Sequence, residues 1–226
     1  ALGLLHRAEL SILKRLQAAD RLAEQLEKAR ESLIFSDEEL RRQTSQFLHD
    51  RVQSDLMVVA MKLKSIQGES SRENQDVIGK AIARLEKTRT SDLRNLVQIL
   101  TPNFQGAGFI ESVKTLCNQF QIDYVSTFDI SSQVEEFENN QQLGIFRIIE
   151  QSLLNSLVHA QSKNVQVSLS VGEHDIVLLK VTDDGPGSDL SLIHPGVGSS
   201  VIDSWVSILK AKKEIATSPG EGYTLT

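Results

Sequence analysis

The stretch QFLHDRVQSDL, residues 46 to 56, sets a histidine beside a carboxylate inside a strongly helical pattern. Apolar residues recur from this stretch onward at steps of three and four, which defines the buried stripe of an amphipathic helix: Leu48, Val52, Leu56, Val59, Leu63 and Ile66. His49 lies at the edge of the stripe, so one ring nitrogen can stay in water while Asp50 accepts a hydrogen bond from the other. His49 and Asp50 are therefore a candidate nucleophilic pair, and the alternative is an ordinary histidine on a helix surface.

Composition limits the classes of partner and the compartment. The chain has 226 residues, enough for one or two domains, and 24 basic against 30 acidic side chains give a net charge of -6. This balance argues against a nucleic-acid partner, which needs a dense basic surface. The single cysteine, Cys117, allows no internal disulfide and forms no zinc site alone, so we expect a reducing compartment. No apolar run approaches the roughly 20 residues of a membrane helix and no signal peptide opens the chain, so we expect a cytoplasmic location and no membrane segment within this fragment, with a sensor or membrane segment before it left open.

A seven-residue repeat of apolar positions marks the first part of the chain. Its members are Leu5, Ile12, Ala19, Leu26, Leu33, Leu40 and Phe47. A period of seven keeps one stripe facing a partner helix under left-handed supercoiling, whereas an isolated helix drifts by about 20° per heptad. The repeat predicts a coiled-coil signalling helix over residues 1–35 and a parallel homodimer. The alternative is a long helix packed within one subunit.

A helical hairpin is expected over residues 36–103. The sequence from Ser36 to Glu39 has the form of a capping box, which predicts a helix start or a hinge at residue 36. The helix that carries His49 should end near Gln67, and a second helix should close before Pro102, because proline cannot continue the hydrogen-bond ladder. Two such hairpins bury both apolar faces as a four-helix bundle.

Residues 104–226 mix helical and strand patterns. The expected helices cover residues 109–120, 140–159 and 199–210, and the expected strands cover residues 124–130, 165–171, 176–181, 214–217 and 223–226. A glycine-bearing loop, residues 183–187, follows directly after one of the strands. The fold class is therefore α+β, with helices first and a mixed α/β domain after them.

Six short motifs appear in one order along the chain. They are His49-Asp50, then residues 93–102, 147–155, 183–187, 196–198 and 220–224. From about residue 36 to the end, these motifs resemble the cytoplasmic core of bacterial two-component sensor histidine kinases, in the subfamily that includes nitrate-sensing and desaturase-regulating kinases. The resemblance implies a dimeric four-helix bundle for histidine phosphotransfer, followed by an α/β sandwich of the Bergerat type, the ATP-binding domain of the GHKL group.

The resemblance also implies a chemistry. His49 would take the γ-phosphoryl group of ATP, with Mg²⁺ as the metal cofactor, and pass it to an aspartate on the receiver domain of a response regulator. Asn155 would be the metal ligand and Asp183 the acceptor for the adenine amino group. The full set of implied cofactor-binding residues is Asn155, Asp183, Gly185, Gly187, Gly196, Gly198 and Thr224.

Three departures from the family pattern bear on activity. Gln151 stands where the family usually has a glutamate, and the acid has moved to Glu150, about 100° away around a helix. Val158 stands where the family tends to have Lys or Arg, and Ser54 replaces the usual phosphatase glutamine while Gln53 lies one position early. The alternative function is therefore a degenerate kinase fold that acts as a dimeric binding module and signals by conformation.

Overall fold

The computed structural model describes residues 2–120, 125–158, 162–172, 176–190 and 196–226. It contains two units, Ala1–Glu39 and Leu40–Thr226, and each is described by itself. Most of the connection between the strands predicted at residues 165–171 and 176–181 lies outside the described residues.

The first unit is helical throughout its described part. Helix α1 (Leu2–Phe47) has 46 residues and runs through residue 36 without interruption. The helix start predicted at Ser36 is therefore wrong, because a continuous helix keeps every backbone hydrogen bond that a cap would only partly replace. The hinge predicted there as the alternative stays a prediction. Among the apolar positions of the heptad repeat, Ile12, Leu26 and Leu33 are 58%, 55% and 70% exposed. An exposed apolar stripe is what a coiled coil needs, and the coiled coil itself stays a prediction.

The hairpin of the second unit ends where the sequence predicts. Its segments are η1 (Leu48–Val52), α2 (Gln53–Gln67), α3 (Arg72–Lys87), η2 (Thr88–Asp92) and α4 (Leu93–Leu100). α2 packs against α3, and α4 ends before Pro102 as expected. The apolar pattern of the sequence does not indicate that η1 and η2 are π turns. Each inserts one extra residue into a helix, a feature that occurs often at functional sites.

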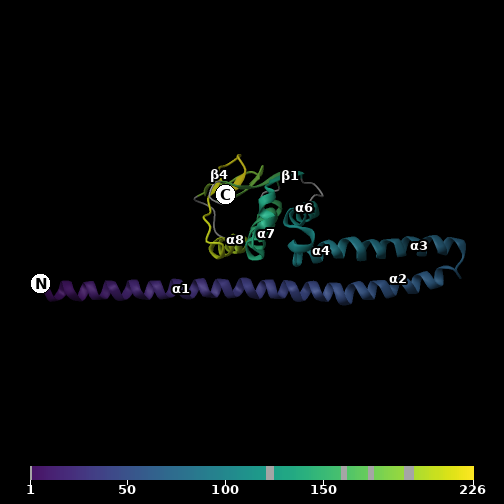
Figure 1. Ribbon diagram of the computed structural model, residues 1–226, viewed down its shortest axis with the longest axis horizontal. Helices are drawn as coiled ribbons and strands as arrows, with labels where there is room; N and C mark the ends of the chain where they lie inside the picture. The colour runs from purple at the N-terminus through teal and green to yellow at the C-terminus, as the bar shows by residue number, and fades with distance from the viewer. Residues whose placement is uncertain (1, 121–124, 159–161, 173–175, 191–195) are drawn as a thin grey trace. The chain divides into compact units, whose positions relative to one another are not determined.

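The rest of the second unit is a two-layer α/β domain. Its elements are α5 (Phe104–Ala107), α6 (Phe109–Gln119), β1 (Val125–Ile130), η3 (Ser132–Glu136), α7 (Asn139–Val158), β2 (Asn164–Val171), β3 (Val177–Asp183), α8 (Val197–Ile208), β4 (Ile215–Thr217) and β5 (Tyr223–Leu225). The strands form one sheet in the order β1-β2-β3-β5-β4, in which β1 runs parallel to β2 and the other neighbours are antiparallel. Within this unit, α6, α7 and α8 lie on one face of the sheet (Figure 1). The predicted α+β fold class is confirmed.

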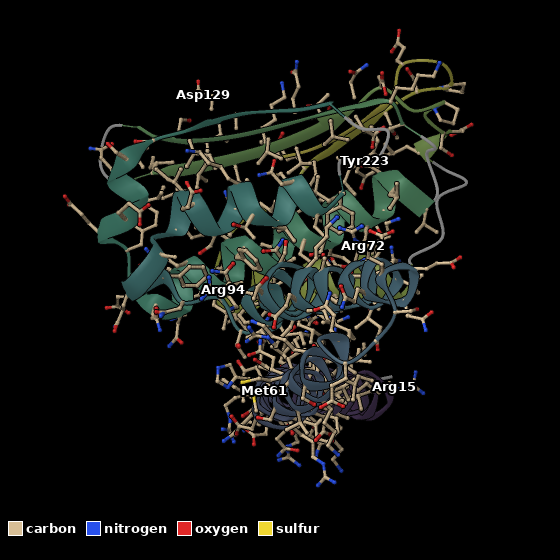
Figure 2. All side chains as sticks on the ribbon, turned by 90° about the vertical axis from the view of Figure 1, so that its right-hand side faces the viewer. Arg15, Met61, Arg72, Arg94, Asp129 and Tyr223 are labelled. Carbon is tan, nitrogen blue, oxygen red and sulfur yellow. The ribbon has the colours of Figure 1, made fainter. Side chains whose placement is uncertain are left out.

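The core lies between the sheet and α7. Val165, Val167 and Leu169 alternate along β2 with more exposed residues, and all three are fully buried or nearly so. They pack in one cluster with Phe146 and Leu153 of α7. Figure 2 shows the two layers edge-on, with the label of Asp129 on the open face of the sheet.

The exposed apolar residues of α2 lead to the first test. Val59 is 46% exposed in the single chain although it belongs to the helical stripe. If this face packs against a second copy, Val59→Glu should raise the dissociation constant of the dimer about a hundredfold or more, since burying a valine contributes about 1.5 kcal/mol or more in each subunit. Light scattering measures the mass, and Lys62→Glu, at an exposed position, is the matched control. A monomeric parent protein at micromolar concentration would contradict the dimer.

Candidate functional site

The histidine of the candidate pair lies on the π turn η1 and faces solvent. Nδ1 of His49 lies 2.9 Å from Oδ1 of Asp50, and the two side chains are 62% and 64% exposed. Because a carboxylate can only accept, Nδ1 carries the hydrogen and Nε2 keeps its lone pair. The arrangement expected from the sequence is present, and it leaves an accessible nucleophilic nitrogen.

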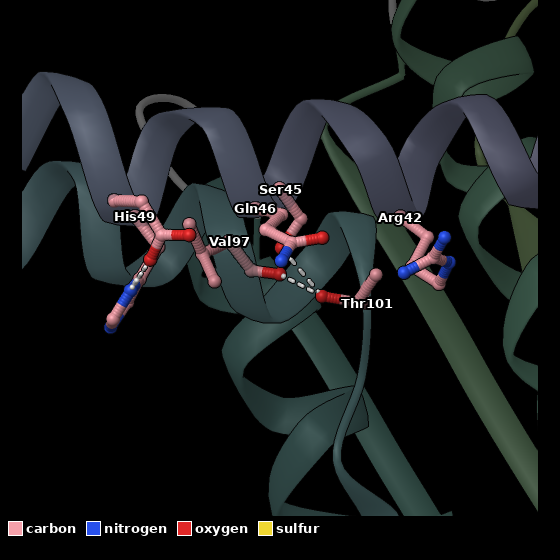
Figure 3. Close-up of a pocket in the computed structure, with 7 residues that line it drawn as sticks. Arg42, Ser45, Gln46, His49, Val97 and Thr101 are labelled. Carbon is pink, nitrogen blue, oxygen red and sulfur yellow. Dashed lines mark hydrogen bonds and ion pairs between the residues drawn. The ribbon is translucent and has the colours of Figure 1, made fainter.

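A shallow groove runs beside this histidine, between the end of α1 and the end of α4 (Figure 3). It is lined by Arg42, Ser45, Gln46, His49, Asp50, Val97 and Thr101. Ser45 is buried, and its hydroxyl lies 2.7 Å from that of Thr101, which also approaches the carbonyl oxygen of Val97 at 3.2 Å. These hydrogen bonds hold Ser45 and Thr101 in place on one part of the groove, while His49 on the other part stays exposed.

The end of β3 carries a buried carboxylate. Asp183 is 6% exposed; Oδ2 accepts a hydrogen bond from Oγ of Ser156 at 2.8 Å, and Oδ1 accepts one from the backbone N–H of Gly185 at 2.9 Å. Each carboxylate oxygen has a second lone pair. The carboxylate of Asp183 is thus held in place on the helix side of the sheet, and it can accept further hydrogen bonds.

The loop after Asp183 interlocks with the turn before β5. Gly187 has φ +61°, and a Cβ there would lie 2.0 Å from the carbonyl oxygen of Ser218. Gly222 has φ +77°, and a Cβ there would lie 2.1 Å from the carbonyl oxygen of Asp183. Only glycine fits at either position, because both the backbone conformation and the contact exclude a side chain. The two loops therefore pack backbone against backbone around the carboxylate.

Asp184 anchors the same loop. Its carboxylate accepts hydrogen bonds from the backbone N–H groups of Lys163 and Asn164 and from Nδ2 of Asn164, at 2.8, 2.9 and 2.6 Å. The backbone and side-chain hydrogen bonds from Asn164 hold the pKa of Asp184 below its usual value. Asp184 therefore ties the loop to the start of β2, a structural role distinct from that of Asp183.

Asn155 lies beneath the first turn of α8. Its Oδ1 accepts a hydrogen bond from Nε2 of Gln151 at 3.1 Å. A Cβ on Gly198 would lie 2.5 Å from Nε2 of Gln151 and 2.6 Å from Oδ1 of Asn155, so a glycine is needed for this approach. Gly196, the N-cap residue, has an ordinary φ of -88°, and a Cβ there would meet no atom of the described residues within 4 Å. The start of α8 brings free backbone N–H groups and the positive end of the helix dipole to this place.

The side chain beside Asp183 on β5 is Tyr223. The strand register pairs Tyr223 with Asp183 and Thr224 with Thr182, and cross-strand partners share a face of the sheet. The Thr224 hydroxyl lies 3.1 Å from that of Thr182, on the opposite face from Asp183. Thr224 therefore lies outside the group that Asp183 forms with its neighbours. Figure 2 labels Tyr223 between the sheet and the helices.

Tyr223 itself is half-buried in a negatively charged setting. Burial raises the pKa of its phenol, and the carboxylates of Asp183 and Asp203 raise it further. The phenol therefore stays a hydrogen-bond donor at neutral pH. The sequence could have indicated Tyr223 only if the register of the short strand β5 against β3 had been known.

Several known proteins are similar to this chain in sequence. No family model matches the chain. The oxygen sensor histidine kinase NreB of Staphylococcus carnosus is 23% identical over 192 residues, 80% of this chain and 55% of that protein. The signal transduction histidine-protein kinase/phosphatase DegS of Brevibacillus brevis is 24% identical over 218 residues, 90% of this chain and 56% of that protein. The chain is a homologue of the sensor histidine kinases.

The chain spans little more than half the length of these two relatives. Among solved structures, the histidine kinase domain of the Erythrobacter litoralis blue-light activated histidine kinase EL346 aligns over 76% of this chain and 92% of its own, with a TM-score of 0.48 and 14% identity.

Of the helices that the structure describes, none is both long and apolar enough to cross a bilayer.

Glu150 and Val158 are two α7 residues near Asn155 at which this sequence departs from the family pattern. Glu150 is buried, and its carboxylate lies within 3.1 Å of Arg41 and of Arg147, so it serves a different contact from that of Asn155. Val158 is 63% exposed at the end of α7. Neither residue replaces the carboxylate or the cation that the family pattern has near the asparagine.

Proposed function

We propose that this chain is a histidine kinase core that transfers the γ-phosphoryl group of ATP to Nε2 of His49. The observation that supports this most is the hydrogen bond between Nδ1 of His49 and Asp50, which leaves an exposed nitrogen with a free lone pair. A kinase also needs a site for its nucleotide. The buried carboxylate of Asp183, in the loop that Gly187 and Gly222 pack together, supports such a site.

The nucleotide would lie between Asp183 and the start of α8. The free lone pairs of Asp183 suit the adenine amino group, and the phenol of Tyr223 suits an acceptor nitrogen on the same ring. The N–H groups of the first turn of α8 suit phosphate oxygens, which the helix dipole also favours. Asn155 fits Mg²⁺ as a neutral oxygen ligand; when bound, the ion would neutralise charge on the phosphates.

The transfer step follows from the histidine geometry. Nε2 attacks the γ-phosphorus, a P–N bond forms and the P–O bond to ADP breaks. The ring becomes positively charged, and Asp50 stabilises that charge through the hydrogen bond that it already holds with Nδ1. Passage of the phosphoryl group to an aspartate on a receiver domain would follow, with the hairpin of residues 36–103 as donor and residues 104–226 as the ATP-binding domain of a homodimer.

A second function is favoured by one specific contact. Because Gln151 donates to Oδ1 of Asn155, it engages the oxygen that a metal would need. With an exposed Val158 in place of a cation, this favours a dimeric binding module that signals by conformation, with weak or no kinase activity.

Incubation with γ-labelled ATP and Mg²⁺ separates the two functions. We expect label on the protein that survives base and is lost in acid, as for a phosphoramidate, and no label on His49→Gln. Peptide mapping should place the label within residues 46 to 56. ATP binding without label would favour the binding module.

A further inference from the structure

Helices α7 and α8 pack side by side and run in opposite directions (Figure 1). Gly198, in the first turn of α8, lies against Gln151 and Asn155 near the end of α7. Leu209, the C-cap residue at the other end of α8, lies against Gly144 near the start of α7. Each end of α8 therefore meets α7 at a glycine.

The residues at these two contacts belong to one stripe on each helix. The stripe of α7 is Gly144, Ile148, Gln151 and Asn155, and the stripe of α8 is Gly198, Ile202, Trp205 and Leu209. The spacing in both stripes is four, three and four residues, which keeps the members on one side of a helix. Ile148, Ile202 and Trp205, in the middle of the stripes, are buried. The side of α7 that carries Asn155 is thus the side that packs against α8.

The contact between Gly144 and Leu209 leaves no room for a side chain at residue 144. A Cβ on Gly144 would lie 2.9 Å from Cδ1 of Leu209 and 3.0 Å from both Cδ2 and Cγ. Rotation about the bond between Cβ and Cγ of Leu209 moves the two methyl groups but leaves Cγ in place. Because ordinary contacts between carbon atoms are about 3.5 to 4.0 Å long, the two helices would have to move apart there by about 0.5 to 1 Å.

Leu209 cannot easily move without the rest of α8. Its backbone N–H donates to the carbonyl oxygen of Trp205, and the N–H of Ala211 donates to that of Val206, both at 2.9 Å. The side chain of Leu209 packs against the buried core cluster of the domain. Since protein interiors are close-packed and transmit strain, a displacement at Leu209 is carried along α8 to its first turn.

The groups proposed to hold the phosphates and the adenine belong to different elements. Asp183 ends β3, so a shift of α8 moves the N–H groups offered to the phosphates and leaves the adenine acceptor in place. Hydrogen bonds from N–H to oxygen are about 2.7 to 3.2 Å long and weaken as they lengthen. A displacement of about 0.5 to 1 Å, the amount that ordinary carbon contacts require, is therefore enough to weaken them.

We propose that Gly144 is a positioning residue for the phosphates of the nucleotide. Through Leu209, Gly144 sets how closely α8 approaches α7, and thereby where the first turn of α8 lies over Asn155. This inference rests on the proposed function for the identity of the ligand. The packing of α8 that it invokes can be measured without a nucleotide.

Gly144→Ala tests the positioning role. We expect the affinity for ATP to fall by about tenfold or more, the usual effect of weakening a hydrogen bond to a charged group. The affinity for adenosine, which has no phosphate, should stay unchanged, and this also shows that the variant is folded. Weaker helix formation is not the cause of such a split, because alanine favours a helix more than glycine does. Calorimetry with each of the two ligands gives both affinities.

A second substitution at the contact should remove the effect. Leu209→Ala deletes the three atoms that a Cβ at residue 144 would meet. The double variant should therefore bind ATP as tightly as Leu209→Ala alone, since substitutions that act through one contact are not additive. Gly79→Ala, a glycine inside α3 of the hairpin, is the matched control and should leave the affinity for ATP unchanged.

The fluorescence of Trp205 reports the packing of α8 in the absence of nucleotide. Trp205 is the single tryptophan of the chain and lies one turn before Leu209 on the same stripe. Its emission should shift to longer wavelength in Gly144→Ala, because looser packing admits water to the ring. The shift should be absent in Gly79→Ala, and the double variant should have the emission of Leu209→Ala alone.

An unchanged affinity for ATP in Gly144→Ala would overturn the positioning role, whether or not the emission of Trp205 moves. Equal losses of affinity for ATP and adenosine would overturn it as well, since they would show a general disturbance of the domain. If the parent protein binds neither ligand, the proposed function fails and the positioning of phosphates fails with it. A shift of Trp205 emission that the double variant removes would still establish the packing of α8 on Gly144.

Discussion

Asp183→Asn should lower the affinity for ATP by about ten- to a hundredfold. The substitution turns one acceptor oxygen into an NH₂ donor. Facing the N–H of Gly185 or the adenine amino group, that NH₂ would meet another donor, whereas the Ser156 hydroxyl could turn to accept from it because it also reaches the carbonyl oxygen of Ser152. Loss of a charged acceptor costs about 1.5 to 3 kcal/mol, which corresponds to this range of affinity.

Calorimetry measures the affinity of the Asp183 variant, and Trp205 offers a second signal. Trp205 is the single tryptophan of the chain and is buried in α8, the helix whose first turn would meet the phosphates. The control is Thr224→Ala, which lies on the opposite face of the sheet and should leave affinity unchanged, whereas Tyr223→Ala should weaken it. A parent protein that binds no nucleotide would favour the binding module, and a strong effect of Thr224→Ala would contradict the nucleotide site proposed above.

Local patterns predicted most of the elements because the signals act within a few residues. The end of α2 at Gln67, the antiparallel pair β2 and β3, and the pair β4 and β5 all follow from apolar periodicity and from turn residues. The helix start at Ser36 is wrong for the same reason: a capping box is a local option, and the helical residues on both sides of it made continuation more stable.

Features that depend on register or on distant partners could not be predicted. Thr224 and Tyr223 differ by one position, and a shift of one residue moves a side chain to the other face of a sheet. The π turns at Leu48–Val52 and Thr88–Asp92 leave the apolar spacing almost unaltered. One partner of Glu150, Arg41, lies more than a hundred residues away in sequence, so no local pattern could link these two residues.

In the candidate site, too, the contacts between residues close in sequence could be predicted and those between distant residues could not. The hydrogen bond from His49 to Asp50 joins adjacent residues and was predicted from their spacing. Gln151 and Asn155 are two amides one turn apart on a helix, so a hydrogen bond between them follows from their spacing. The approach of Gly198 to both side chains depends on how α8 packs on α7, which the spacing does not give.

Gln151→Glu should raise the rate of His49 labelling by about 10²- to 10⁴-fold, the usual contribution of a positioned acid-base group. A carboxylate at this position can accept a proton, which the amide cannot. It also has no N–H to donate, so Oδ1 of Asn155 would lose the hydrogen bond from Gln151 and be freed for another ligand. The affinity for ATP should change little, because such a group acts mainly in the transition state.

Rapid-quench measurement of the labelled protein gives the rate for Gln151→Glu and its parent. Gln141→Glu, the same substitution at an exposed position near the start of α7, is the matched control and should leave the rate unchanged. His49→Gln should abolish the label in every background, since an amide is not a comparable nucleophile. If the parent labels briskly and Gln151→Glu does not alter its rate, Asp50 already supplies the base or Gln151 does not occupy the place of the family's glutamate. If both proteins bind ATP and neither labels, Val158 is the next position to restore, and the binding module becomes the better description of this chain.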